Sequence, residues 1–182
     1  MIIIQNRVWV VTMYNHILYP TDGSEAADAV RTHVQSLAEN YDSRVHILYV
    51  VDSNYSKSSM TLRQDDDGTW KTGMVSRGRG EDQGGMSKDK VDVLDVLERE
   101  GRELVEEIAE ELSQQQGYKT VTACKQGKPH RVINSYAEDN DIDLIAMGTH
   151  GRSGVSRQLI GSVTQKVVRT ADVPVLTVRQ ST

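Results

Sequence analysis

The chain has 182 residues, and its 26 acidic side chains against 21 Lys and Arg give a formal net charge of −5. An acidic protein lacks the basic surface that a nucleic-acid binder needs, so we expect no nucleic-acid partner. The single cysteine, Cys124, excludes an internal disulfide and a cysteine-cluster metal site. No apolar run approaches the roughly 18 residues of a membrane span, and the length is typical of one domain.

The first twelve residues, MIIIQNRVWVVT, are apolar around Arg7. They lack the order of a signal peptide, in which the charge precedes a longer apolar stretch that ends in small residues. Two interpretations stay open: an extra edge strand or disordered tail, and an extension upstream of a true start at Met13. We therefore separate a tail, residues 1–13, from a single domain over residues 14–182, and expect a cytoplasmic protein.

From residue 14 on, short apolar runs alternate with helically spaced apolar residues. The runs predict strands over residues 16–19, 45–51, 118–124, 144–147 and 173–178. The helical spacings predict one helix capped by Ser24, one from Val91 to a stop at Gly117, one that opens at Pro129, and one over residues 161–170. Pro20 is expected to stop the first strand, and Pro174 favours a sheet edge for the last.

Strands that alternate with helices predict an α/β fold, with a parallel sheet, right-handed crossovers and helices on both faces, as a three-layer sandwich. Five strands fit a doubly wound sheet of the flavodoxin or Rossmann type, in the flavodoxin order or the related order 3-2-1-4-5. In such sheets ligands bind outside the carboxyl ends of the strands, where the winding reverses.

Residues 52–90 interrupt this alternation. Only seven of these 39 residues are apolar, and residues 65–67 form an acidic run. A segment with so few apolar side chains cannot fold alone, so we expect a disordered or loosely docked polar insert. The run RGRG at residues 77–80 resembles an RNA-binding segment, but the two acidic residues that follow favour a solvated linker.

Glycines cluster after the fourth strand. Gly148, Gly151 and Gly161, followed by Ser162, form the pattern G-x2-G-x9-G-S/T, which ends where the last helix begins. Glycine allows positive φ and a close approach of backbone N–H groups to a phosphate, and a helix N-terminus adds unpaired donors and partial positive charge. The alternative is that these glycines only shape a loop, but four elements at this spacing favour phosphate binding.

A second polar group, PTDG at residues 20–23, follows the first strand. In a 3-2-1-4-5 sheet the first and fourth strands are neighbours where the winding reverses, so this turn and the glycine loop meet at one crevice. Asp22 is placed to contact ribose or adenine, or to hold Mg²⁺ or Mn²⁺ that bridges phosphates. Its alternative role is to cap the helix that follows.

Three segments resemble the universal stress protein family: PTDGS at residues 20–24, YVVD at residues 49–52, and GTHGRSG…GSV across residues 148–163. The similarity covers residues 14–51 and 91–180. It implies the strand order 3-2-1-4-5, homodimers and, because the glycine motif is intact, the ATP-binding branch of the family. The polar insert departs from the family pattern and falls beside the implied adenine pocket.

The resemblance also implies, by position, a set of nucleotide-binding residues. Pro20, Thr21 and Asp22 would meet adenosine, with the backbone of Val50 at the adenine edge. Met147 and Gly148 would lie at the ribose, and the phosphates would be held by Gly151, Gly161, Ser162 and Val163. No residue is assigned as catalytic.

We therefore expect a cytoplasmic, ATP-binding stress-response regulator that acts as a ligand-gated homodimer with little or slow hydrolysis. Three alternatives stay open: an ATPase or phosphotransferase in which Asp22 organises Mg²⁺ or Mn²⁺, an interaction module that recruits protein partners without nucleotide, and a flavin protein, which the few aromatic residues disfavour. The last predicted strand, from Val173 to Val178, is apolar and lies at an edge, so we expect it to pair with its copy in the dimer.

Overall fold

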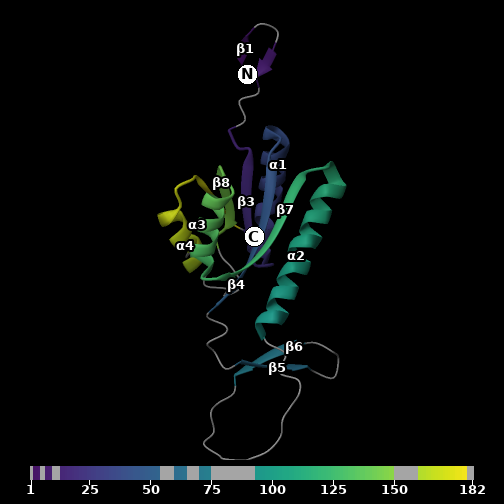
Figure 1. The fold of residues 1–182 in the computed structure, drawn as a ribbon, viewed down its shortest axis with the longest axis vertical. Helices are drawn as coiled ribbons and strands as arrows, with labels where there is room; N and C mark the ends of the chain where they lie inside the picture. Colours follow the sequence, from purple (N-terminus) through teal and green to yellow (C-terminus); the bar gives the residue numbers. More distant parts are fainter. Residues whose placement is uncertain are drawn as a thin grey trace, which may run out of the picture.

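The computed structural model describes residues 2–4, 7–9, 13–53, 60–64, 70–74, 93–149 and 160–179. Its main sheet has five strands in the order β7-β4-β3-β8-β9, and every neighbouring pair is parallel (Figure 1). The strands are β3 (His16–Thr21), β4 (Arg44–Asp52), β7 (Lys119–Gly127), β8 (Leu144–Gly148) and β9 (Val175–Val178). Counted in chain order they run 3-2-1-4-5, which confirms the predicted doubly wound α/β fold.

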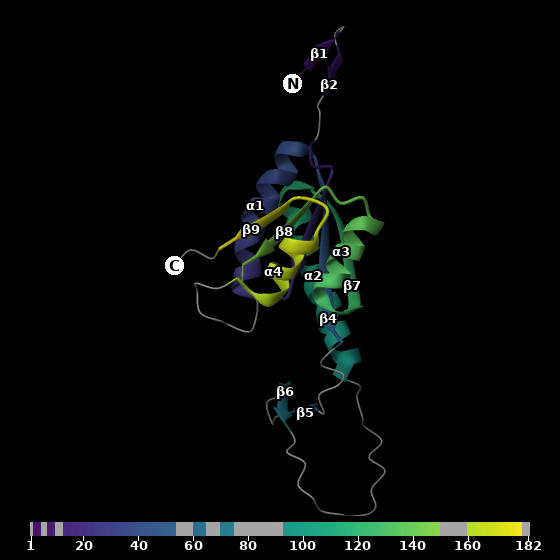
Figure 2. The ribbon, with the colours of Figure 1, turned by 90° about the vertical axis from the view of Figure 1, so that its left-hand side faces the viewer.

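Within the described residues, two helices cover each face of this sheet (Figures 1 and 2). On one face lie α1 (Glu25–Tyr41) and α2 (Val93–Gln116), and on the other lie α3 (Pro129–Asp139) and α4 (Ser162–Thr170). Successive side chains of β3 lie on opposite faces of the sheet. Ile17 and Tyr19 pack with α1 and α2, and Leu18 packs with α3 and α4. Because both sides of the sheet are covered, the central strands β3, β4 and β8 are mostly apolar and buried, whereas the edge strand β7 is not.

The predicted helix boundaries have clear local causes. The Ser24 side chain accepts from the Ala27 N–H at 3.3 Å and so caps α1, which ends at Asp42 in the left-handed region, with φ 52°. Pro129 is the first residue of α3, as predicted, where a missing N–H costs nothing. Gly117 follows α2 with φ 70°, a conformation that favours glycine.

The strand boundaries differ from the prediction by one to three residues, most at the end of β7, which runs to Gly127 instead of residue 124. β3 continues through Pro20 to Thr21, so the expectation that Pro20 ends the first strand is wrong. Its ladder with β4 runs to Thr21, whereas its ladder with β8 ends at Leu18. A proline donates no hydrogen bond and is tolerated where a neighbouring ladder has already ended. β9 begins at Val175, two residues later than predicted.

The segments outside the sandwich form their own strand pairs. β1 (Ile2–Ile4) pairs antiparallel with β2 (Arg7–Trp9) in a separate two-stranded sheet, so the N-terminal segment is not an extra edge strand of the main sheet. Within the insert, β5 (Met60–Gln64) pairs antiparallel with β6 (Trp70–Met74), a hairpin that the sequence analysis did not predict. The other residues between 54 and 92 lie outside the described ranges. No helix in the described ranges is long and apolar enough to cross a membrane.

Candidate functional site

The turn after β3 is ordered by its own side chains. The Gly23 N–H donates to Thr21 Oγ1 at 3.2 Å, and the Ser24 N–H donates to Asp22 Oδ1 at 3.1 Å. Gly23 has φ 72°, which a non-glycine residue would rarely adopt. Asp22 is therefore part of the turn that starts α1, and its half-buried carboxylate stands at the carboxyl end of β3.

Gly148, at the end of β8, joins three elements. A Cβ at this position would lie 2.5 Å from the Ala26 carbonyl oxygen, so the first turn of α1 rests directly on the glycine backbone. The Gly148 carbonyl accepts a hydrogen bond of 2.8 Å from Thr164 Oγ1, which is 4% exposed, in the first turn of α4. The N-termini of α1 and α4 therefore meet at the end of β8, where the sequence predicted the ligand.

The start of α4 offers backbone donors to an anion. Its N-cap is Gly161, and among the described residues no side chain caps the helix. The Gly161 N–H donates to the Thr149 carbonyl at 2.7 Å, and intrahelical bonding begins when the Gln165 N–H donates to the Gly161 carbonyl at 2.9 Å. The N–H groups of the first turn have no intrahelical acceptor, and the helix dipole makes this end partially positive. Backbone donors without a cap are the chemistry that binds phosphate.

Positive φ, which was predicted as one reason for glycine in this motif, does not occur at Gly148 or Gly161. Gly161 has φ −57° and ψ 149°, which any residue can adopt, and the described glycines with positive φ do not include Gly148. Positive φ is therefore not the reason for glycine at these two positions. At Gly148 the reason is the close approach of the Ala26 backbone.

The structure brings most of the predicted residues to one edge of the sheet. Pro20 and Thr21 end β3, Met147 and Gly148 end β8, and Gly161, Ser162 and Val163 begin α4. Ser162 is exposed, whereas the Val163 side chain packs against the core, so only its backbone can meet a ligand. Val50 lies near the end of β4, half-buried on the α3–α4 face. Gly151 lies outside the described residues.

Thr164 was not among the predicted site residues. This residue follows the glycine motif directly, and its buried hydroxyl ties α4 to the end of β8. The signal was available, because a threonine in the first turn of a helix is placed to hydrogen-bond a nearby backbone carbonyl.

The metal prediction rests on Asp22 alone. Among the described residues, no group of three or more His, Cys, Asp or Glu side chains could hold a metal ion. A divalent cation at this edge would therefore need phosphate oxygens as its other ligands, as Mg²⁺ commonly does in nucleotide sites.

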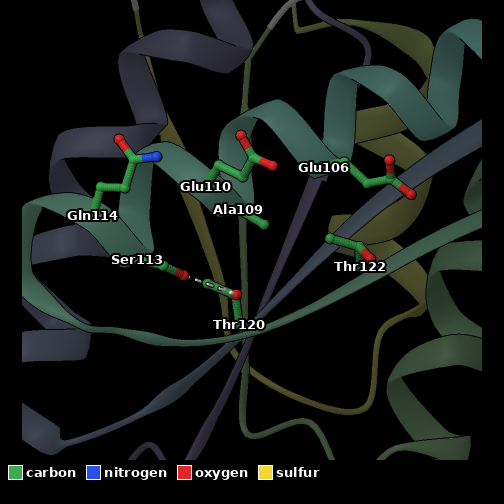
Figure 3. A pocket seen from close by; sticks show the side chains of 7 residues that line it. All are labelled: Glu106, Ala109, Glu110, Ser113, Gln114, Thr120 and Thr122. Atoms are coloured by element: carbon green, nitrogen blue, oxygen red, sulfur yellow. Dashed lines mark hydrogen bonds between the residues drawn. The ribbon is translucent and has the colours of Figure 1, made fainter.

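A groove lies away from this edge, between α2 and the edge strand β7 (Figure 3). It is a polar groove of about 560 Å³, lined by side chains that include Glu106, Glu110 and Thr122. The Ser113 and Thr120 hydroxyls meet there at 3.4 Å. The groove is open and lies toward the start of β7, so it is separate from the carboxyl edge.

The opposite, amino edge of the sheet holds a buried histidine. His46 Nε2 lies 3.0 Å from His16 Nδ1, and His46 Nδ1 lies 3.1 Å from the Tyr136 hydroxyl. His46 is 4% exposed. Desolvation, together with the charges of His16 and Arg44, lowers the pKa of His46 to about 4. At neutral pH the ring is therefore uncharged, and each of its nitrogens has a hydrogen-bonding partner.

The fold and the arrangement at the carboxyl edge define the class of doubly wound α/β proteins with a site at the point where the winding reverses. A model of the universal stress protein family matches residues 13–179, and the chain belongs to that family. Universal stress protein MJ0577 of Methanocaldococcus jannaschii is 30% identical over 168 residues, 92% of this chain and 96% of that protein. Universal stress protein MJ0531 of the same organism is 29% identical and covers 92% and 84%. The solved structure of MJ0577 has a TM-score of 0.65 at 27% identity, covering 93% of this chain and 98% of that one.

Proposed function

We propose that this protein is a cytoplasmic nucleotide-binding regulator of the stress response, with ATP as its ligand. The observation that carries the proposal is the N-terminus of α4, which no described side chain caps and which the Thr164–Gly148 hydrogen bond fixes beside the first turn of α1. Membership of the universal stress protein family supports the stress-response role. Two solved structures of the same fold, at 18% and 16% identity and TM-scores of 0.54, contain cAMP and dAMP. Both nucleotides should therefore be compared with ATP in binding measurements.

Most of the predicted residues have a role in this proposal, and Met147 and Gly148 would lie at the ribose. The turn of Pro20, Thr21 and Asp22 faces adenosine, with the Val50 backbone at the adenine edge. The phosphates accept hydrogen bonds from the backbone N–H groups at the start of α4 and from the Ser162 hydroxyl. Mg²⁺ or Mn²⁺ would be held by the phosphates and Asp22, and would neutralise part of their charge.

Nucleotide binding is tested by Gly161→Val. The Gly161 backbone is extended, so valine is compatible with its φ and ψ, but the branched side chain would cover the N–H groups of the first turn. We expect ATP affinity to fall more than about tenfold in equilibrium dialysis, the effect of losing charge-assisted hydrogen bonds. Unchanged affinity in a folded variant would refute the assignment.

A matched control lies at the other end of the same helix. Ala171 is the C-cap of α4 and has a similar extended backbone, with φ −75° and ψ 138°. Ala171→Val adds the same branched side chain about ten residues away, where no phosphate is expected. It should therefore leave ATP affinity unchanged.

We further propose that the protein acts as a homodimer through β9. This strand ends the sheet order, so its outer backbone groups have no partner strand within the described sheet. A hydrogen-bonded route links it to the nucleotide site: the Gly161 N–H donates to the Thr149 carbonyl, and the Thr149 N–H donates to the Val178 carbonyl at 3.0 Å. A ligand that shifts the start of α4 would act on the dimer edge through these two bonds.

A further inference from the structure

Basic side chains gather where α3 and α4 pack against each other. Lys128, His130 and Arg131 stand at the start of α3, and Lys166 stands on α4. Lys128, Arg131 and Lys166 are exposed, and within the described residues none of the three forms an ion pair. In a chain with a net charge of −5, unpaired cations gathered at one place need an explanation.

The geometry of α3 and α4 brings this cluster together. Both helices run from the carboxyl edge of the parallel sheet toward its amino edge, so they are parallel, and Figures 1 and 2 show them side by side. Asn134 Nδ2 donates to Thr170 Oγ1 at 2.7 Å, which fixes their relative register. One turn earlier on each helix, toward the carboxyl edge, stand His130 and Lys166.

The pKa of His130 agrees with this placement of Lys166 beside it. Desolvation, and next the positive charge of Lys166, hold the pKa of His130 below its ordinary value. Arg131 and Lys128 act in the same direction, and Asp52 acts against them. The cationic side chains are therefore close enough to repel a proton on His130, and an anion among them would relieve this repulsion.

Lys166 connects the cluster to the proposed phosphate site. It lies one turn after Ser162 on the same face of α4, about 6 Å along the helix axis. Helical side chains lean toward the N-terminus of their helix, so Lys166 covers the turn where Ser162 begins α4. An anion chain that starts at the first N–H groups of α4 and extends toward α3 would meet the Lys166 ammonium.

We propose that Lys166, with Arg131 and Lys128 behind it, holds the outer phosphates of a bound nucleotide and gives this protein a preference for nucleoside triphosphates over monophosphates. This inference rests on the proposed nucleotide site and adds its selectivity. The adenosine end and the first phosphate are held elsewhere, by the turn after β3 and the start of α4. Lys166 therefore affects ligands only when they carry more than one phosphate.

The test compares dissociation constants for ATP, ADP and AMP, measured by calorimetry on the full chain. Lys166→Gln should weaken ATP about five- to tenfold, as expected for a charge contact that solvent partly screens, and leave AMP within about twofold. Lys166→Arg should restore most of the ATP affinity. Arg169→Gln removes an equal charge from the last turn of α4 and should change neither ligand. The salt dependence of ATP binding should also be shallower in Lys166→Gln than in the wild type.

The outcomes separate this inference from the proposed function. If the wild type binds ATP and AMP equally, or Lys166→Gln weakens both equally, the role of Lys166 is overturned and nucleotide binding stands. If the wild type binds neither, both proposals fall. Circular dichroism of each variant shows whether it is folded, and Lys166→Arg gives the same comparison should the glutamine variant be destabilised.

Discussion

Lowering the pH should destabilise this protein through His46, the buried ring at the amino edge of the sheet. The folded ring has a pKa of about 4, whereas the ordinary value is 6.5. His46 Nε2 faces His16 Nδ1 at 3.0 Å, so a proton on both rings would place two donors against each other. The unfolded chain therefore binds a proton between these pKa values that the folded chain rejects.

The sign and size of the effect follow from these two pKa values. A base whose pKa is lowered by folding contributes stability that is complete above pH 6.5 and is lost as the pH falls toward 4. The free energy of unfolding should fall through His46 by about 2 kcal/mol at pH 5 and by about 3 kcal/mol at pH 4. Domains of this size are stable by only about 5–15 kcal/mol, so the loss is large.

Urea unfolding at pH 7, 6, 5 and 4 measures this loss, provided that wild type and variants are compared at one protein concentration. His46→Gln keeps a donor and an acceptor for His16 and Tyr136 but cannot titrate. Carboxylates contribute equally in both proteins, so the difference between the two pH profiles isolates His46. We expect the variant to be less stable at pH 7 and to lose about 2 kcal/mol less than the wild type between pH 7 and 5.

The control is His33→Gln on the exposed face of α1. It should keep the pH profile of the wild type, because His33 is exposed and is not a hydrogen-bonding partner of His46. If His46→Gln and the wild type gave parallel profiles from pH 7 to 4, burial of a neutral His46 would not be the source of acid sensitivity.

Two further predictions concern packing and assembly. Gly101→Ala should destabilise the protein by about 1–2 kcal/mol in urea unfolding, because a Cβ would overlap the buried Tyr49 ring; a gain of about 1 kcal/mol, as helix propensity alone predicts, would contradict this. Thr177→Pro should reduce the proposed dimer to about half its mass in light scattering. The carbonyls of Pro174 and Val178 accept from β8, so Thr177 directs its N–H to the open side of the edge. The Leu176 backbone faces β8, so Leu176→Pro should instead weaken the sheet. A dimer that survives Thr177→Pro would place the interface elsewhere.

Strand order and layers could be predicted because buried strands and amphipathic helices alternate along this sequence. The errors came from features that depend on neighbours. Pro20 ends a strand in most contexts, but here the ladder with β8 has already ended at Leu18, so β3 continues with β4 alone. The β5–β6 hairpin depends on pairing between two short polar segments, which leave little apolar periodicity to detect.

The position of the candidate site could be predicted from the sequence, but the contacts that shape it could not. Strand order alone places the turn of Asp22 and the end of β8 together, since they follow neighbouring strands. The contacts that fix their geometry are not visible in spacing. Gly148 was expected to lie at the ribose as part of a phosphate-binding glycine motif, yet its lack of a side chain is already required by the Ala26 carbonyl. Thr164 is ordinary as a helix residue until β8 presents a carbonyl to it.

The two edges of the sheet differ in where their polar groups find partners. This difference indicates which edge binds ligands. At the amino edge, His46 bonds to His16 and Tyr136, so its polar atoms are satisfied within the protein. At the carboxyl edge, the Thr164 hydroxyl donates to the Gly148 carbonyl, and within the described ranges no side chain caps α4. A helix start that is anchored yet uncapped retains its donors for another molecule. We therefore expect ligands to act at the carboxyl edge and protons to act on stability at the amino edge.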